Sequence, residues 1–214
     1  MRFPMFVPVT AVLALLAGCQ AADDAPSVPT PLSSTSPLIV AQETSLELRG
    51  VVTSDPWIPS ASTHTPLSRA TRQSNDSAEQ TAAAQALDCA PGTADPLAGR
   101  DSRALPLVTC APTESMVYIL EPEFLPGNNV ASVSASYDPQ RAQWVVNLRF
   151  TSAGTTIWAD FTSKNVNRQV AFVLDSQVIS APNIQSAILD GITQITGKFT
   201  EQSAQQLAHQ IAGS

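Results

Sequence analysis

Ser180 is the residue of this 214-residue sequence that most invites interpretation as a nucleophile, since it stands directly before an Ala-Pro pair. A serine attacks only when a neighbouring base, most often a histidine, removes its proton. Of the two histidines, His64 lies in a stretch without periodicity and His209 on the polar face of the last predicted helix. The sequence contains no Gly-x-Ser-x-Gly, no His-Glu-x-x-His, no phosphate-cradling glycine loop and no Cys/His cluster. We therefore predict no catalytic residues, no cofactor and no metal site.

Two further groups of residues have both a chemical and a structural interpretation. Asp160, Asp175 and Asp190 could act as acids, but each falls on a helix face or in a turn, where a solvated carboxylate is the usual role. Trp144 and Trp158 could form a peptide-contacting surface. At strand and helix spacing, however, tryptophan more often belongs to the core, and we expect core positions for both.

Residues 1–18 have the features of an export signal. Arg2 supplies the positive start, and the apolar run at 6–16 is too short to span a bilayer stably. The segment ends in Leu-Ala-Gly-Cys at 16–19, which resembles the lipobox of bacterial lipoproteins. We therefore expect a diacylglyceryl group on Cys19, which would anchor the chain to a membrane. The alternative is an ordinary secretory signal whose cysteine stands there by chance.

The residues after Cys19 are small, polar and proline-rich, with nothing to bury. Such a composition predicts a disordered tether, and 18 residues of flexible coil (20–37) would reach about 25 Å. The predicted organisation is a lipoprotein signal at 1–18, the lipidated cysteine and tether at 19–44, and a folded domain at 45–214.

The acidic composition argues against one class of partner. Eighteen Asp and Glu against eleven Lys and Arg give a net charge of −7, and no basic stripe is available to neutralise phosphates. We therefore expect no nucleic acid among the partners.

Cys89 and Cys110 are the two cysteines that remain once Cys19 is acylated. Because an exported protein meets an oxidising compartment, the simplest expectation is a structural disulfide between them. A redox pair would favour closer spacing such as Cys-x-x-Cys, and a metal site would need further ligands.

In the first part of the folded domain, apolar residues alternate only weakly with other residues. Leu46, Leu48 and Val52 alternate with Glu47, Arg49 and Val51, which predicts a half-buried strand over 46–52. Residues 53–75 contain prolines, serines and threonines without periodicity, which predicts a long surface loop or a disordered insert. Ser77 and Gln80 fit a capping box, so a short helix with an alanine face is expected over 78–87.

The core is expected at 130–212. Alternating apolar residues predict a hairpin over 131–150 with a turn at Asp138-Pro139, and Thr151 or Ser152 can cap a helix after it. Strands follow at 170–179 and 193–199, and Thr200 caps a last helix. The apolar face of that helix is Ala204, Leu207, Ala208 and Ile211. The pattern predicts an α+β fold, with a mixed, mostly antiparallel sheet covered by helices on one side.

This last stretch resembles the extracytoplasmic head domain of SecD, the membrane subunit that assists the Sec translocon. The matching positions are Leu174 and Asp175; Val178, Ser180, Ala181 and Pro182; Ile188 and Gly191; Gln194, Ile195, Gly197 and Phe199; Ala204, Leu207 and Ala208. Upstream, residues 46–52 resemble a strand of the family, and 87–89 with 107–110 resemble the cysteine pair of actinobacterial SecD heads. Ser176 and Asp190 replace two family glycines, both with residues that suit turns.

The resemblance implies a non-enzymatic domain that binds unfolded preprotein or docks on Sec translocon subunits to assist export. In SecD a bundle of membrane helices follows the matching region, whereas this sequence stops at Ser214. We therefore expect a free-standing lipoprotein, anchored at the outer face of the cytoplasmic membrane. The alternative is a structural or regulatory envelope lipoprotein that kept the fold but not the export role.

Overall fold

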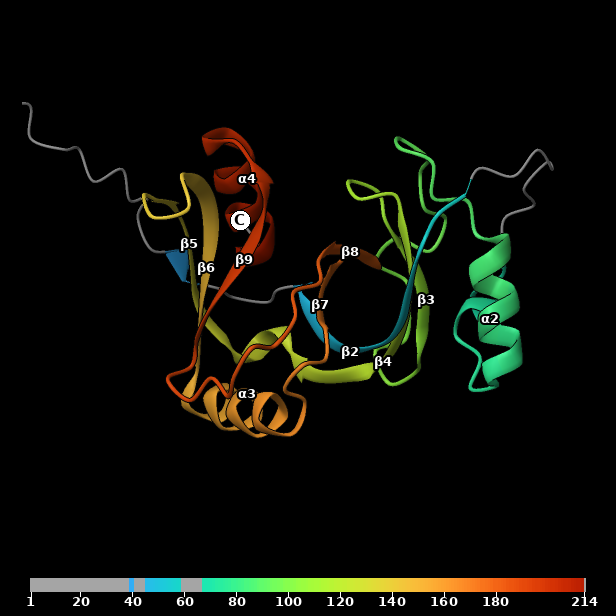
Figure 1. Ribbon diagram of the computed structural model, residues 1–214, viewed down its shortest axis with the longest axis horizontal. Helices are drawn as coiled ribbons and strands as arrows, with labels where there is room; N and C mark the ends of the chain where they lie inside the picture. The colour runs from blue at the N-terminus through green and yellow to red at the C-terminus, as the bar shows by residue number, and fades with distance from the viewer. Residues whose placement is uncertain (1–38, 41–44, 59–66, 214) are drawn as a thin grey trace, which may run out of the picture. The chain divides into compact units, whose positions relative to one another are not determined.

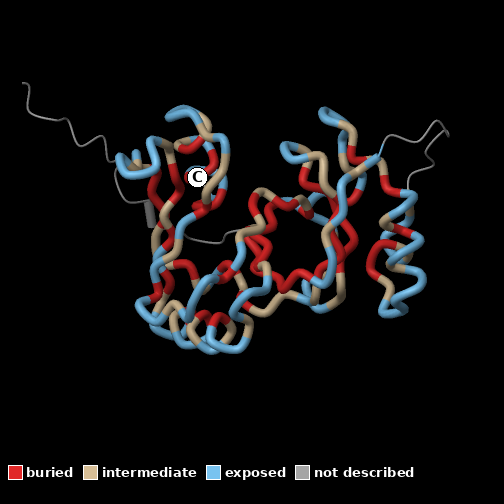
Figure 2. The backbone as a smooth tube through the Cα atoms, viewed as in Figure 1, coloured by how far each residue is buried: buried red, intermediate tan, exposed pale blue. Residues whose placement is uncertain are grey.

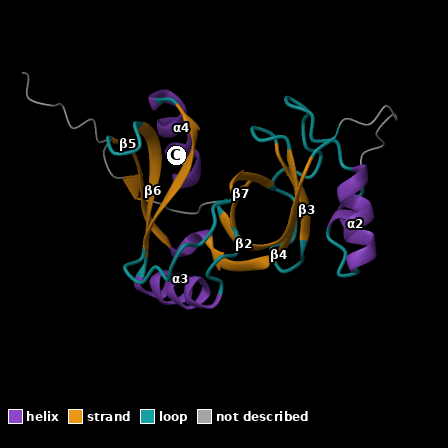
Figure 3. Cartoon of the chain, in the orientation of Figure 1, coloured by secondary structure: helices purple, strands orange, loops and turns teal. Residues whose placement is uncertain are grey.

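The computed structural model describes residues 39–40, 45–58 and 67–213, and their strands pair into two antiparallel sheets (Figures 1 and 3). The sheet orders are β1-β5-β6-β9 and β3-β4-β2-β7-β8. The strands are β1 (Ile39–Val40), β2 (Glu47–Pro56), β3 (Leu107–Ala111), β4 (Met116–Pro126), β5 (Val130–Asp138), β6 (Gln143–Phe150), β7 (Val170–Leu174), β8 (Gln177–Ser180) and β9 (Ile192–Phe199). The helices are α1 (Arg69–Arg72), α2 (Ser77–Ala86), α3 (Ser152–Lys164), α4 (Glu201–Ala212) and the short 3-10 helix η1 (Gly127–Asn129). The predicted α+β class is confirmed, with two sheets in place of one.

The β5–β6 hairpin forms because apolar side chains alternate on both strands. Val133 pairs with Leu148 and Ala135 with Val146, and all four side chains are buried in the main core. Helix α4 packs against β5 and β6 and covers this core (Figure 1). The same core extends across β2 and β7 of the second sheet to α3.

Helix α4 follows the prediction made from its periodicity. Its buried face consists of Ala204, Leu207, Ala208, Ile211 and the additional Ala212. Thr200 is the N-cap, and a capping box joins it to Ser203. Gly213 ends the helix in the left-handed conformation with φ of 75°.

The second sheet curls until its two outer strands, β3 and β8, lie in contact (Figure 1). Three register shifts between β2 and β4 accompany the bend, as expected where bulges sharpen the twist of a strand. The hydroxyl of Thr109 on β3 donates to the carbonyl of Ser176 beside β8. Apolar side chains fill the inside of the curl, where the backbone is buried in Figure 2.

Strand β2 corrects the prediction of a half-buried strand. Glu47 and Arg49 are 4% and 0% exposed, whereas Val52, expected in the core, is 53% exposed. Residues on both faces of β2 are buried because the strand lies between β4 and β7 in the sheet and contributes to a core on each face. Leu48 belongs to the core shared with α3, and Val51 belongs to the core inside the curl.

The described parts of 53–75, residues 53–58 and 67–75, contain more regular structure than the loop predicted for them. Strand β2 continues to Pro56, α1 occupies 69–72, and Arg72 is 2% exposed. Residues 59–66 lie outside the described part of the chain.

Helix α2 begins with Asp76 as its N-cap instead of the predicted Ser77. The Asp76 carboxylate accepts hydrogen bonds from the backbone N–H groups of Ala78 and Glu79, so it caps the helix directly. Among the described residues, no helix has the length and apolar character needed to cross a membrane.

Candidate functional site

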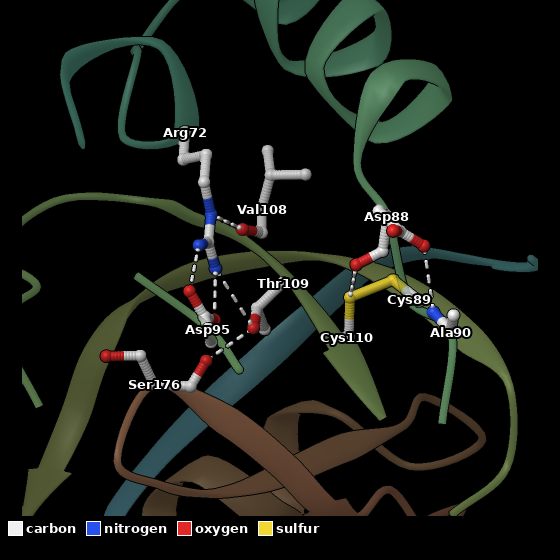
Figure 4. The surroundings of a disulfide bond; sticks show 9 residues. All are labelled: Arg72, Asp88, Cys89, Ala90, Asp95, Val108, Thr109, Cys110 and Ser176. Carbon is white, nitrogen blue, oxygen red and sulfur yellow. Dashed lines mark hydrogen bonds and ion pairs between the residues drawn. A yellow bond between two sulfur atoms is a disulfide. The ribbon is translucent and has the colours of Figure 1, made fainter. Parts of the chain in front are cut away.

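The disulfide between Cys89 and Cys110 is present and ties the segment after α2 to β3 (Figure 4). Both cysteines are buried in a small cluster with Ala83 and Val108. They are 21 residues apart in the sequence, and closing a loop of that size contributes about 3 kcal/mol to stability in the chain-entropy model. The bond therefore stabilises a region with little apolar core of its own.

A buried arginine supports the same region from the other side (Figure 4). The Arg72 guanidinium pairs in a bidentate manner with Asp95, at 2.5 and 2.9 Å, and Nε donates to the Val108 carbonyl at 2.9 Å. Nη2 also donates to the Thr109 hydroxyl at 3.3 Å. These bonds attach α1 and the 95–98 loop to β3, which is a structural role.

A second buried arginine, Arg49, joins β2 to the loop that precedes β3. Its guanidinium donates to Glu47 at 2.7 Å, to Asp101 at 2.8 Å and to the Leu105 carbonyl at 2.7 Å. Asp101 in turn accepts a 2.6 Å hydrogen bond from the Ser176 hydroxyl. The two acidic side chains and the arginine are each at most 6% exposed.

The surroundings of Ser176 explain how a serine can replace a glycine of the family pattern. Asp175 and Ser176 have φ of 49° and 63°, the geometry of a tight two-residue hairpin turn in which glycine is favoured. The Ser176 hydroxyl also accepts from the Gly99 N–H at 3.0 Å. The hydrogen bonds to Asp101 and Gly99 offset the cost of this backbone conformation.

Two carboxyl groups near Arg49 have a raised pKa. Burial raises the pKa of Glu47, while the neighbouring Arg49 lowers it. Burial likewise raises the pKa of Glu123, whose Oε1 lies 3.8 Å from Arg103 and has no hydrogen-bond partner within the described residues. These shifts accompany a structural ion-pair cluster, because the side chains of Glu47 and Glu123 are only 6% and 7% exposed.

The residues considered as catalytic candidates are not brought together. The Ser180 hydroxyl is buried and donates to the Thr196 carbonyl at 2.9 Å, while His209 is exposed on α4. Asp160 forms an exposed ion pair with Lys164, and Asp175 and Asp190 are exposed in or beside turns. Cys19 and His64 lie outside the described residues.

Gly191 lies in the connection from β8 to β9, where its backbone passes close to another element. Its φ is 68°, and a β-carbon there would collide with the side chain of Thr155 on α3. Its carbonyl accepts from the Phe150 N–H at 2.9 Å. This position requires glycine because the connection passes directly over α3.

Trp144 and Trp158 differ in exposure. Trp158 on α3 is 1% exposed and confirms its expected core position. Trp144 on β6 is only partly buried, with its ring edge-on to Tyr137 at 6.0 Å.

A groove of about 970 Å³ runs between β8 and β9, where the two sheets approach each other. The β9 side is formed by Thr196, Gly197, Lys198 and Phe199, the β8 side by residues 177–180, and Leu207 of α4 contributes an apolar wall. Strand β9 pairs with β6 on one side, and within the described residues no strand pairs with its other edge. An open strand edge beside a groove with both polar and apolar lining is a geometry that can bind extended polypeptide by main-chain hydrogen bonds.

Sequence reasoning missed this groove, since strands from different sheets form it. Strand periodicity alone does not show which edge remains open.

These features define an antiparallel α+β domain with an open strand edge. The family model for the SecDF P1 head subdomain matches residues 105–214, just over half of the sequence. The chain therefore belongs to the SecDF P1 head family.

Individual relatives agree with this assignment over part of the chain. The protein translocase subunit SecD of Mycobacterium tuberculosis is 43% identical over 118 residues, which cover 54% of this chain and 21% of that protein. SecD of Rickettsia conorii is 40% identical over 95 residues, covering 44% of this chain and 18% of that protein. The chain thus spans about a fifth of the length of these relatives. A crystal structure of SecDF in a super-membrane-facing form aligns with a TM-score of 0.47 at 23% identity, over 81% of this chain and 19% of that one.

Proposed function

We propose that this protein is a non-enzymatic, lipid-anchored lipoprotein of the outer face of the cytoplasmic membrane, and that its SecD head-like domain binds extended polypeptide during protein export. The observation that carries the proposal is the groove along the open edge of β9 in a domain of this family. Such an edge offers main-chain donors and acceptors to any extended chain, with little preference for sequence.

We expect this binding to be weak. One short strand edge and a single groove offer a small contact area, and micromolar dissociation constants correspond to about −8 kcal/mol. A membrane anchor compensates for weak binding, because it raises the local concentration of the domain at the site where chains emerge.

We expect the anchor to depend on Cys19, and a Cys19→Ala protein to leave the membrane fraction almost completely. The lipobox-like residues 16–19 motivate this expectation. The measurement is the distribution of the protein between soluble and salt-washed membrane fractions. Retention of the variant on salt-washed membranes would show that the anchor is elsewhere.

Site-specific photocrosslinking in cells that export a stalled preprotein tests the binding itself. The crosslinker is placed at Gln194 and Lys198, two exposed positions on β9, and Glu79 on α2 serves as a matched exposed control. We expect adducts to the preprotein from the β9 positions, at least several-fold more abundant than from Glu79. Adducts to SecD, SecF or SecY alone would favour docking on the export machinery. Equal yields from all three positions would favour the structural or regulatory interpretation.

A further inference from the structure

Five charged side chains from β2, β4 and the loop before β3 form a cluster that the proposed function does not use. They are Glu47 and Arg49 on β2, Asp101 and Arg103 in the loop 99–105, and Glu123 on β4. The side chains of the three acidic residues are 6%, 2% and 7% exposed, in the order Glu47, Asp101, Glu123. With every group ionised, two guanidiniums face three carboxylates, and the net charge is 2 − 3 = −1. An excess charge in a buried position is costly.

Arg49 has no donor left for Glu123. Its guanidinium makes five hydrogen bonds, to the carboxylates of Glu47 and Asp101 and to three backbone carbonyls. A guanidinium has five N–H donors, so all of them are used.

Arg103 is the other cation of the cluster, and two carboxyl groups share it. Its Nε lies 3.4 Å from Glu47 Oε1, and its Nη1 lies 3.8 Å from Glu123 Oε1. A good charge-assisted hydrogen bond is shorter, at about 2.7–2.9 Å. The Arg103 side chain is also 43% exposed, so water screens its charge. Arg103 therefore offsets only part of the excess negative charge.

Glu123 is the carboxyl group with the weakest support. Its Oε1 is buried and has no hydrogen-bond partner within the described residues. Burial raises the pKa of Glu123, and the carboxylates of Glu47 and Asp101 add to the rise, while Arg103 and Arg49 oppose it. A proton on Glu123 would bring the cluster to 2 − 2 = 0 and would supply an O–H donor.

We propose that Glu123 holds a proton in the folded protein, and that the loss of this proton to water loosens the 99–105 loop from β4. The loop is attached beside this carboxyl group, because the Glu123 N–H donates to the Arg103 carbonyl at 2.9 Å. An ionised Glu123 needs either water or a closer Arg103, and both require the loop to move. The cluster is therefore a pH-sensitive clamp, which is closed when Glu123 is protonated.

Hydrogen bonds connect this clamp to one wall of the β8–β9 groove. Asp101 accepts from the Ser176 hydroxyl at 2.6 Å, and the Gly99 N–H donates to the same hydroxyl at 3.0 Å. Ser176 directly precedes β8, whose residues form that wall. The clamp would operate whether or not the groove binds polypeptide.

Glu123→Gln removes the proton site and keeps the size of the side chain. The measurement is urea unfolding of the full-length mature protein in detergent, with the disulfide intact, from about pH 4 to about pH 8. Because the folded-state pKa of Glu123 lies above its ordinary value of 4.5, its protonation contributes stability at low pH that is lost as the pH rises through the folded-state pKa. We therefore expect the folding equilibrium constant of Glu123→Gln, divided by that of the unmodified protein, to rise with pH by up to about tenfold per pH unit, the slope that one proton gives.

Glu121→Gln is the matched control, since it makes the same change on the same strand where the side chain is 39% exposed. We expect its folding equilibrium constant, relative to the unmodified protein, to change little with pH. A ratio for Glu123→Gln that stays constant would overturn the proposal. A ratio that falls with rising pH would do so too, because that is the behaviour of a carboxylate that is ionised and paired in the folded state.

Hydrogen–deuterium exchange of the unmodified protein tests the loop and does not depend on the stability of a variant. After correction for the intrinsic pH dependence of exchange, we expect residues 99–105 to exchange several-fold faster at about pH 8 than at about pH 5.5. Helix α4 serves as the internal reference, and its corrected rate should not change. In Glu123→Gln the loop should exchange at one corrected rate at both pH values. Equal rates in the unmodified protein, or the same increase in the variant, would show that Glu123 does not control the loop and would overturn the clamp.

Discussion

We expect Arg49→Met to lower the free energy of unfolding by about 3–5 kcal/mol near neutral pH, the range found when one partner of a buried ion pair is removed. Methionine keeps the apolar stem but removes the guanidinium that binds Glu47, Asp101 and the Leu105 carbonyl. Two buried carboxylates then lose their shared countercharge. Urea unfolding at about pH 7.5 measures the loss.

We expect the loss of unfolding free energy in Arg49→Met to become smaller as the pH falls. Burial already raises the pKa of Glu47, and Arg49 is the main group that opposes the rise. Removing Arg49 raises that pKa further. A carboxyl group whose folded-state pKa lies above its unfolded value contributes stability at low pH, and this contribution is lost as the pH rises through the folded-state pKa. The difference between the two proteins is therefore smaller at about pH 5 than at pH 7.5.

Arg168→Met is the matched control for this prediction. Arg168 pairs with Glu121, but their side chains are 46% and 39% exposed. Solvent screens such a pair, so we expect a loss below about 1 kcal/mol with little dependence on pH. Similar losses in the two variants would show that the Arg49 cluster contributes no more than a surface ion pair.

Arg49 also shows where sequence reasoning failed. The alternation over 46–52 assigned Glu47 and Arg49 to solvent, because charged residues on an amphipathic strand normally face water. Their burial depends on Asp101, which is 52 residues away from Arg49. The same holds for Arg72 and Asp95, since a segment without periodicity gives no sign of a partner 23 residues further on. Local patterns do not contain such pairings.

The elements that were predicted correctly depend on interactions between residues close to one another in the sequence. Caps at Thr151 and Thr200, the buried stripe of α4 and the β5–β6 hairpin each follow from residues within a few positions of one another. The β8–β9 groove does not, because it arises where strands from different sheets approach each other. The residues that would bind a partner are thus the ones that periodicity describes least well.

We expect Ile211→Ala to destabilise the domain by about 2–5 kcal/mol, the usual cost of removing a large side chain from a packed core. Ile211 is 0% exposed and belongs to the core that α4 shares with β5 and β6. Because Leu207 also lines the β8–β9 groove, Ile211 gives the cleaner measure of helix docking.

Gln210→Ala is the matched control, since it changes the neighbouring residue of the same helix to the same amino acid at an exposed position. Alanine is a slightly better helix former than glutamine, so this variant should stay within about 0.5 kcal/mol of the unmodified protein. Chemical denaturation of both variants, with the disulfide intact, gives the comparison. Equal and small changes would mean that α4 is not docked on the sheet in solution, and the α4 wall of the β8–β9 groove would then be missing as well.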